Sequence, residues 1–113
     1  MQRVFKENDI VWRKMPFNEK VSYYRVTEYN QKQDRLGTIS LLTGIEGIME
    51  AKDFHHYWLQ IGDNFIHADD GVAVRILNIR IQGERLVVDV SYLTGTRGTF
   101  SISEQFCRSI TLL

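Results

Sequence analysis

The sequence predicts a mainly β protein made of two small units in tandem, related by an internal repeat. Two observations support this prediction. The segment SLLTGIEG at residues 40–47 returns as SYLTGTRG at residues 91–98. Segments rich in β-branched and aromatic residues also alternate with short polar or glycine-containing turns along the whole chain. Because repeats with this kind of period are typical of duplicated structural units, we expect one unit over residues 1–61 and a second over residues 62–113.

In the first unit, the pattern predicts four strands, a tight turn and a final apolar stretch. The polar run QKQD at residues 31–34 marks the first bend, because such residues favour turns over strands. The predicted segments are residues 9–12, 21–30, 36–42 and 47–54, followed by HHYWLQI at residues 55–61.

The second unit repeats this plan, with NFIHA at residues 64–68 as its first strand. The next two strands are predicted at residues 72–82 and 85–93, joined by a Gly-Glu turn. In the third strand, strict alternation places Leu86, Val88 and Val90 on one face and Asp89 on the other. The TGTRG turn and the stretch CRSITLL then complete the unit, and the turn glycines are explained by the positive φ that tight turns need.

This layout resembles tandem SH3-like or Tudor-type small β-barrels. The resemblance lies in strand number, strand spacing and duplication, and it covers almost the whole chain. It implies two small barrels that bind extended peptides or nucleic acids on an open groove lined by aromatic residues. A shared fold does not fix function, so the partner has to be argued from the residues themselves.

An alternative fold is a duplicated three-stranded meander followed by a short helix. Apolar residues recur at helical spacing in two places, Ala51, Phe54, Trp58 and Ile61, and Ile102, Phe106, Ile110 and Leu113. Ser101 and Glu104 fit a capping box at the start of such a helix. The β-branched residues of RSITLL favour a strand instead.

The aromatic residues supply the candidate binding site. In the segment SYYRVTEY, alternation sends Tyr23, Arg25 and Tyr29 to one side and Tyr24 to the other. If Tyr24 faces the core, the two outer tyrosines flank an arginine, a combination enriched in binding hot spots. Trp12 adds area to this surface, although its ring also suits the core of an undersized domain. We therefore predict Trp12, Tyr23, Arg25 and Tyr29 as binding residues.

The sequence offers little support for catalysis, a metal centre or a cofactor. The three histidines, His55, His56 and His67, lie near Asp69, but no zinc-binding framework surrounds them, and adjacent histidines on a strand point to opposite faces. No nucleotide loop or nucleophile motif is present, and we expect no enzyme activity. The sole cysteine, Cys107, has the apolar residues Phe106 and Ile110 near it in the sequence and is expected to be a buried structural thiol.

The charge balance and the absence of long apolar runs limit the classes of partner that we expect. The chain carries 14 basic and 14 acidic residues, without the basic excess that is usual for binding to phosphate backbones. A nucleic-acid interface therefore requires a local stripe, for which Arg75, Arg80, Arg85 and Arg97 are the candidates. Without an apolar run at the N-terminus or an internal disulfide, we expect a cytoplasmic protein away from membranes. The expected partner is a protein or peptide, with nucleic acid as the alternative and a homodimer through an open edge strand as a further expectation.

Overall fold

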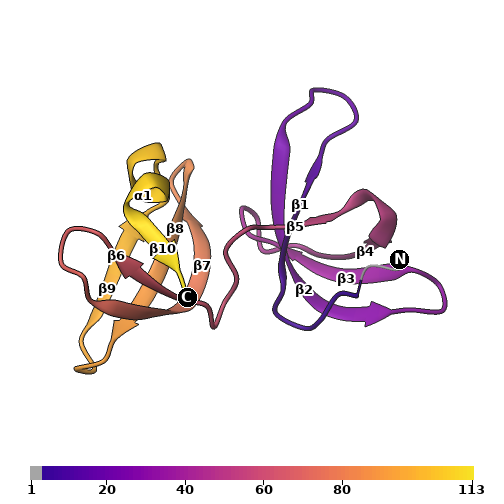
Figure 1. The fold of residues 1–113 in the computed structure, drawn as a ribbon. Coiled ribbons are helices and arrows are strands. Elements are labelled where there is room, and N and C mark those ends of the chain that lie inside the picture. Colours follow the sequence, from indigo (N-terminus) through magenta and orange to yellow (C-terminus); the bar gives the residue numbers. More distant parts are fainter. Residues whose placement is uncertain (1–3) are drawn as a thin grey trace. The chain divides into compact units, whose positions relative to one another are not determined.

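The computed structural model describes residues 4–113, which form a mainly β protein (Figure 1). The chain divides into two compact units: unit 1 ends at Leu59 and unit 2 begins at Gln60. Each unit contains one five-stranded antiparallel sheet. The predicted fold class, mainly β with a repeated unit, is confirmed.

Unit 1 contains the strands β1 to β5 and a single turn of 3-10 helix. The elements are β1 (Ile10–Lys14), β2 (Val21–Asn30), β3 (Arg35–Ser40), β4 (Glu46–Glu50), η1 (Ala51–Asp53) and β5 (His55–His56). The sheet order is β4-β3-β2-β1-β5, so the last strand returns to pair with the first.

Unit 2 repeats this connectivity with a true α-helix before the last strand. Its elements are β6 (Asn64–His67), β7 (Ala73–Gln82), β8 (Arg85–Tyr92), β9 (Arg97–Ser101), α1 (Glu104–Ser109) and β10 (Ile110–Leu112). The order β10-β6-β7-β8-β9 is the same arrangement, with β6 paired to both β7 and β10.

A β-bulge lies at the same place in both units and fixes which residues correspond. The β2–β3 register shifts between Val26 and Glu28, and the β7–β8 register shifts between Ile76 and Asn78. Val26 and Ile76 are both buried in their cores. Counting from these bulges through the strand pairs matches Val11 with Phe65, and both of these side chains are fully buried.

The repeated turn closes the equivalent hairpin in each unit, with different loop lengths. In unit 1 the loop spans residues 41–44, and the Ser40 N–H donates to the Ile45 carbonyl at 3.0 Å. The loop of unit 2, residues 93–95, is one residue shorter. The glycine of each Thr-Gly pair has a positive φ, 73° in unit 1 and 86° in unit 2, which confirms the prediction that these tight turns need glycine.

Each unit has its main apolar core on one face of its sheet, and one apolar residue of the opposite face, Ile10 in unit 1 and Val87 in unit 2, is buried as well. In unit 1 the core cluster comprises Phe5, Val11, Tyr24, Val26, Leu36, Ala51 and Phe54. In unit 2 the buried residues include Phe65, Val74, Ile76, Ile79, Val88, Val90 and Phe106. Tyr24 and Val26 face the core as predicted.

The expectation of closed barrels is wrong, because both sheets are open. No strand pairing among residues 4–113 joins β4 to β5, or β9 to β10. In unit 1, β4 passes directly into η1, and β5 has only two residues, both of which pair with β1. The short outer strands therefore leave two edges on each sheet.

The helical alternative is partly right in both units: unit 2 has the helix α1, and unit 1 has only the single 3-10 turn η1 in place of a helix through Ile61. The helix α1 is capped by Ser103, whose Oγ accepts from the Phe106 N–H at 3.1 Å, so the capping residue is not Ser101. The helix turns Phe106 toward the core and leaves Cys107 exposed, so the expectation of a buried thiol is wrong. The RSITLL segment still ends in a strand, β10.

We expect Gly37→Ala to destabilise unit 1 by about 1–3 kcal/mol, the usual effect of overpacking. The bulge sets both Thr27 and Glu28 against this glycine, and an added Cβ would lie 2.5 Å from Thr27 Oγ1 and 2.8 Å from Glu28 Cγ. Gly47→Ala on β4 is the matched control, because its Cβ would meet only the Met49 methyl carbon at 3.8 Å. Urea unfolding measures both variants, and equal midpoints would contradict the packing argument.

Candidate functional site

Trp12 lies at the centre of a row of rings that crosses three strands of unit 1. It pairs directly with Tyr23 on β2 and with His55 on β5, and directly opposite side chains share one face of a sheet. The Trp12 and His55 ring centroids are 4.6 Å apart. Because the neighbouring residue Val11 points into the core, the row formed by Trp12, Tyr23 and His55, here called the aromatic row, lies on the outer face.

Two further rings after β5 extend the aromatic row. The Tyr57 N–H donates to the Ile10 carbonyl at 2.9 Å, which continues the β1–β5 contact. Its ring meets Tyr23 edge-on at 5.6 Å, and Trp58 follows at 6.0 Å from Tyr57. Trp58 keeps 43% of its surface exposed. The outer face of unit 1 therefore presents a connected group of partly exposed rings.

Arg25 lies on the same outer face, two residues along β2 from Tyr23. Its Nη1 donates to the Asn8 Oδ1 at 2.9 Å, which fixes the guanidinium near the residues that precede β1. Asn8 has a left-handed φ of 73° and donates its own N–H to the Val26 carbonyl. Arg25 is thus positioned before any partner arrives.

Tyr29 does not join the other three predicted residues. The bulge after Val26 reverses the alternation, so Tyr29 pairs with the fully buried Leu36 and packs against the core. Its ring meets Phe5 edge-on at 5.5 Å, and its hydroxyl donates to Asp34 Oδ1 at 3.0 Å. Desolvation of the phenol, together with the Asp34 carboxylate, raises the pKa of Tyr29. The prediction that Tyr23 and Tyr29 flank Arg25 on one face is wrong.

Unit 2 has none of the aromatic row at the equivalent positions. There Ile66 takes the place of Trp12, and it pairs with Ala73 and Thr111. The same strand arrangement therefore forms with an aliphatic and two small side chains. Packing of the fold does not require three rings at these positions in unit 1.

A hollow of about 460 Å³ lies next to the aromatic row. It is lined by Trp12, Arg13, Lys14, Pro16, Asp53 and His55. Sequence reasoning missed Arg13 and His55. The sequence does contain a signal for Arg13. Alternation places it on the same face of β1 as Val11, the core face, where a charged residue is unusual.

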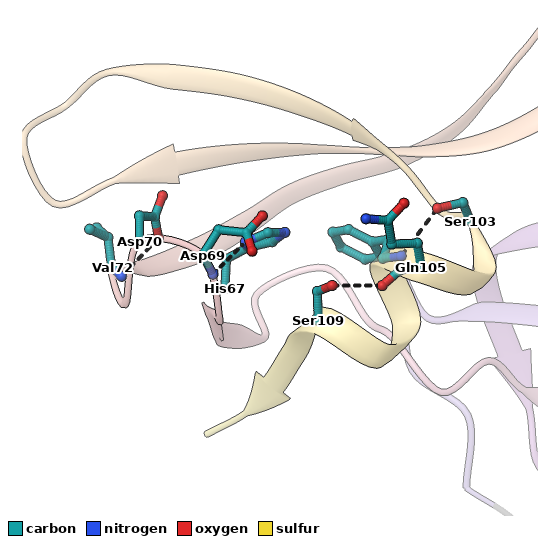
Figure 2. Close-up of polar contacts among 8 residues, drawn as sticks. His67, Asp69, Asp70, Val72, Ser103, Gln105 and Ser109 are labelled. Carbon is teal, nitrogen blue, oxygen red and sulfur yellow. Dashed lines mark hydrogen bonds and ion pairs between the residues drawn. The ribbon is translucent and has the colours of Figure 1, made fainter.

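The histidines divide between the two faces and the two units. His55 belongs to the aromatic row, whereas His56 points the other way, stacks on Phe5 at 4.7 Å and contacts Asp9 Oδ2 at 2.9 Å. In unit 2, His67 Nδ1 lies 3.6 Å from the Asp69 carboxylate (Figure 2). Within residues 4–113, no three metal-ligating side chains gather at one point.

The four arginines proposed for nucleic acid all occupy outer-face positions of the unit 2 sheet. Arg75 and Arg97 pair with the same residue, Ser91, from opposite sides. Arg80 forms two hydrogen bonds with Asp89, at 2.8 and 3.2 Å, so its charge is neutralised. Arg85 lies at the end of the β7–β8 hairpin, several residues along β8 from Ser91, the partner of Arg75 and Arg97.

No family model, curated protein or solved structure matches this chain. Within the described part of the chain, no helix is long and apolar enough to cross a membrane. The candidate site therefore has to be judged from its own geometry.

We expect Asp89→Asn to destabilise the protein at neutral pH and to lose this effect in acid. The hydrogen bonds from Arg80 and then from Thr99 lower the pKa of Asp89, although its partial burial opposes them. The stabilisation is therefore full above the ordinary aspartate pKa of about 3.9 and disappears as the pH falls through the lowered value.

Urea unfolding at a series of pH values checks this expectation, with Glu84→Gln in the exposed β7–β8 turn as the control. The difference in the free energy of unfolding between the parent and Asp89→Asn should become smaller below about pH 4. A difference in the free energy of unfolding that stays constant down to about pH 2 would show that the charge of Asp89 does not cause the stabilisation.

Proposed function

We propose that this protein is a non-enzymatic binding protein, of the adaptor or inhibitor type, that recognises a protein or an extended peptide. The proposed contact surface is the outer face of unit 1. It contains Trp12, Tyr23 and Arg25, which the sequence predicts as binding residues, together with His55. Tyr29 is assigned to the core side. The observation that carries the proposal is the contrast between the units, because unit 2 builds the same sheet without the aromatic row.

The physical properties of this face suit a protein partner. Trp, Tyr and Arg are the residue types that most often dominate binding energy. The rings of Trp12 and His55, and those of Tyr23 and Tyr57, already contact one another, so a partner pays little entropy to order them. The face also combines apolar ring surface with the fixed charge of Arg25, which favours specificity as well as affinity.

We further propose that both units are open relatives of the SH3-like fold and that the protein acts in the cytoplasm. Each unit places a short helical segment before a last strand that returns to the first strand, and this order supports the resemblance. A single exposed cysteine suits a reducing compartment.

The charges on the β4 edge disfavour a homodimer that pairs this strand with its own copy in the symmetric register. The outward residues of β4 are Glu46, Ile48 and Glu50, and the edge of the sheet is open there. Two copies of β4 paired antiparallel about Ile48 would set Glu46 of one copy against Glu50 of the other. Like charges directly opposite in a sheet are destabilising.

A second candidate function is nucleic-acid binding by the outer face of unit 2. The observation in its favour is that Arg75 and Arg97 flank Ser91, giving two exposed cations on one cross-strand row. Against it stands the Arg80–Asp89 pair, which removes one of the four charges. Such binding would weaken steeply with added salt, because it depends on counterion release.

We expect Trp12→Ala and Tyr23→Ala each to weaken partner binding by about tenfold or more, as at a binding hot spot. Affinity capture from nuclease-treated source lysate, quantified by mass spectrometry, measures the retained protein partner. Leu93→Ala, at an exposed turn residue of unit 2, is the control and should retain the partner. Circular dichroism confirms that all three variants are folded.

Two results would contradict the proposal. In a parallel capture from lysate without nuclease, recovery of nucleic acid alone, lost between low and moderate salt and abolished by Arg75→Ala with Arg97→Ala, would favour the second candidate. Capture of the same protein at equal yield by the parent and by both aromatic variants would place the contact surface elsewhere.

A further inference from the structure

Arg13 is a half-buried cation without a carboxylate partner among the described residues. Its side chain follows Val11 on the core face of β1, and its guanidinium carbon lies 5.8 Å from the Tyr24 ring centre and 5.6 Å from that of Phe54. The Nε atom is buried, and within residues 4–113 no atom accepts a hydrogen bond from it. The rings hold the guanidinium in place but cannot satisfy this donor.

The equivalent position in unit 2 is His67, which has an acid from its own chain. His67 stacks on Phe100 at 5.5 Å and lies near Phe106, as Arg13 lies over rings in unit 1. Asp69, two residues further on, brings its carboxylate to 3.6 Å from His67 Nδ1 and donates its N–H to the same atom at 3.3 Å (Figure 2). The residue two positions after Arg13 is Met15, which carries no charge.

The surroundings of Arg13 form a site that is open to an external ligand. Arg13 lines the 460 Å³ hollow together with Lys14, Asp53 and the ring pair Trp12 and His55. Two cationic side chains, Arg13 and Lys14, and one carboxylate, Asp53, line the hollow, so its net charge favours a negative group. Among residues 4–113, neither Arg13 nor Asp53 forms a salt bridge, so this carboxylate does not neutralise the guanidinium.

We propose that this hollow binds a carboxylate of the partner, next to an aromatic or apolar side chain that packs on Trp12. An arginine binds a carboxylate through two parallel hydrogen bonds, and the Arg13 guanidinium, which forms no ion pair within residues 4–113, lines the hollow where such a group would bind. The carboxylate comes either from an acidic side chain or from a chain terminus. This inference rests on the proposed function, because it names the chemical group that the aromatic row would place beside Arg13.

The test is an NMR titration of the ¹⁵N-labelled protein with small carboxylate probes. N-acetyl-phenylalanine represents a chain terminus, and acetyl-Phe-Glu-amide represents an acidic side chain. Their neutral counterparts are N-acetyl-phenylalanine amide and acetyl-Phe-Gln-amide, and inorganic phosphate tests for general anion binding. The readout is the Arg13 Nε–H resonance together with the backbone signals of Trp12 and Lys14.

We expect at least one carboxylate probe to shift the Arg13 Nε–H signal and to bind about tenfold more tightly than its amide, the usual gain from a charge-assisted hydrogen bond. The probe that binds more tightly identifies the source of the carboxylate. Met15→Asp should weaken this binding by a similar factor, because it supplies an internal carboxylate where unit 2 has Asp69. Met15→Asn is the matched neutral control and should bind as the parent does, and Arg13→Gln should lose binding.

Three results would overturn the inference: equal binding of carboxylates and amides, phosphate binding at least as tightly as either carboxylate, or unchanged binding in Met15→Asp. If Arg13→Gln does not fold, the Met15 pair alone decides the outcome. Failure of the probes with capture still dependent on Trp12 removes only this inference. Binding of the probes with capture independent of Trp12 removes only the proposed function.

Discussion

The pairing of β1 with both β2 and β5 is the constraint on which the candidate site depends. Trp12 lies between Tyr23 and His55 only because β5 returns across more than forty residues of chain to lie beside the first strand. The same pairing sets Arg13 on the opposite face, over Tyr24 and Phe54. One strand thus carries the outer aromatic row and, one residue later, the guanidinium that lines the adjacent hollow.

The two units show how a shared backbone can carry different surfaces. Both keep the bulge after the second strand's buried residue, the returning last strand and a glycine of positive φ in the equivalent hairpin. They differ at positions where packing tolerates change: Trp12 corresponds to Ile66, and Arg13 corresponds to His67. Unit 2 forms the same sheet without these side chains, so the packing of this fold does not require the rings of unit 1, and we propose that they serve recognition.

Much of the fold was accessible from the sequence, because strands and tight turns leave local signals. The alternation in Tyr24 and Val26 predicted the buried face of β2, and the Thr-Gly repeat predicted equivalent hairpins. The bulge leaves no such signal, and by inserting one residue it moved Tyr29 to the core side. His55 and Arg13 were missed for another reason. Their roles depend on the long-range pairing of β5 with β1, which periodicity in a single segment cannot reveal.

The most direct test of the account is site-specific photo-crosslinking in living cells. A photoreactive phenylalanine analogue is placed at position 12 of unit 1 or at the equivalent position 66 of unit 2. The account predicts a discrete protein adduct from position 12, with little or none from position 66. Adducts to nucleic acid alone, or equal protein adducts from both positions, would contradict the claim that the outer face of unit 1 is the recognition surface.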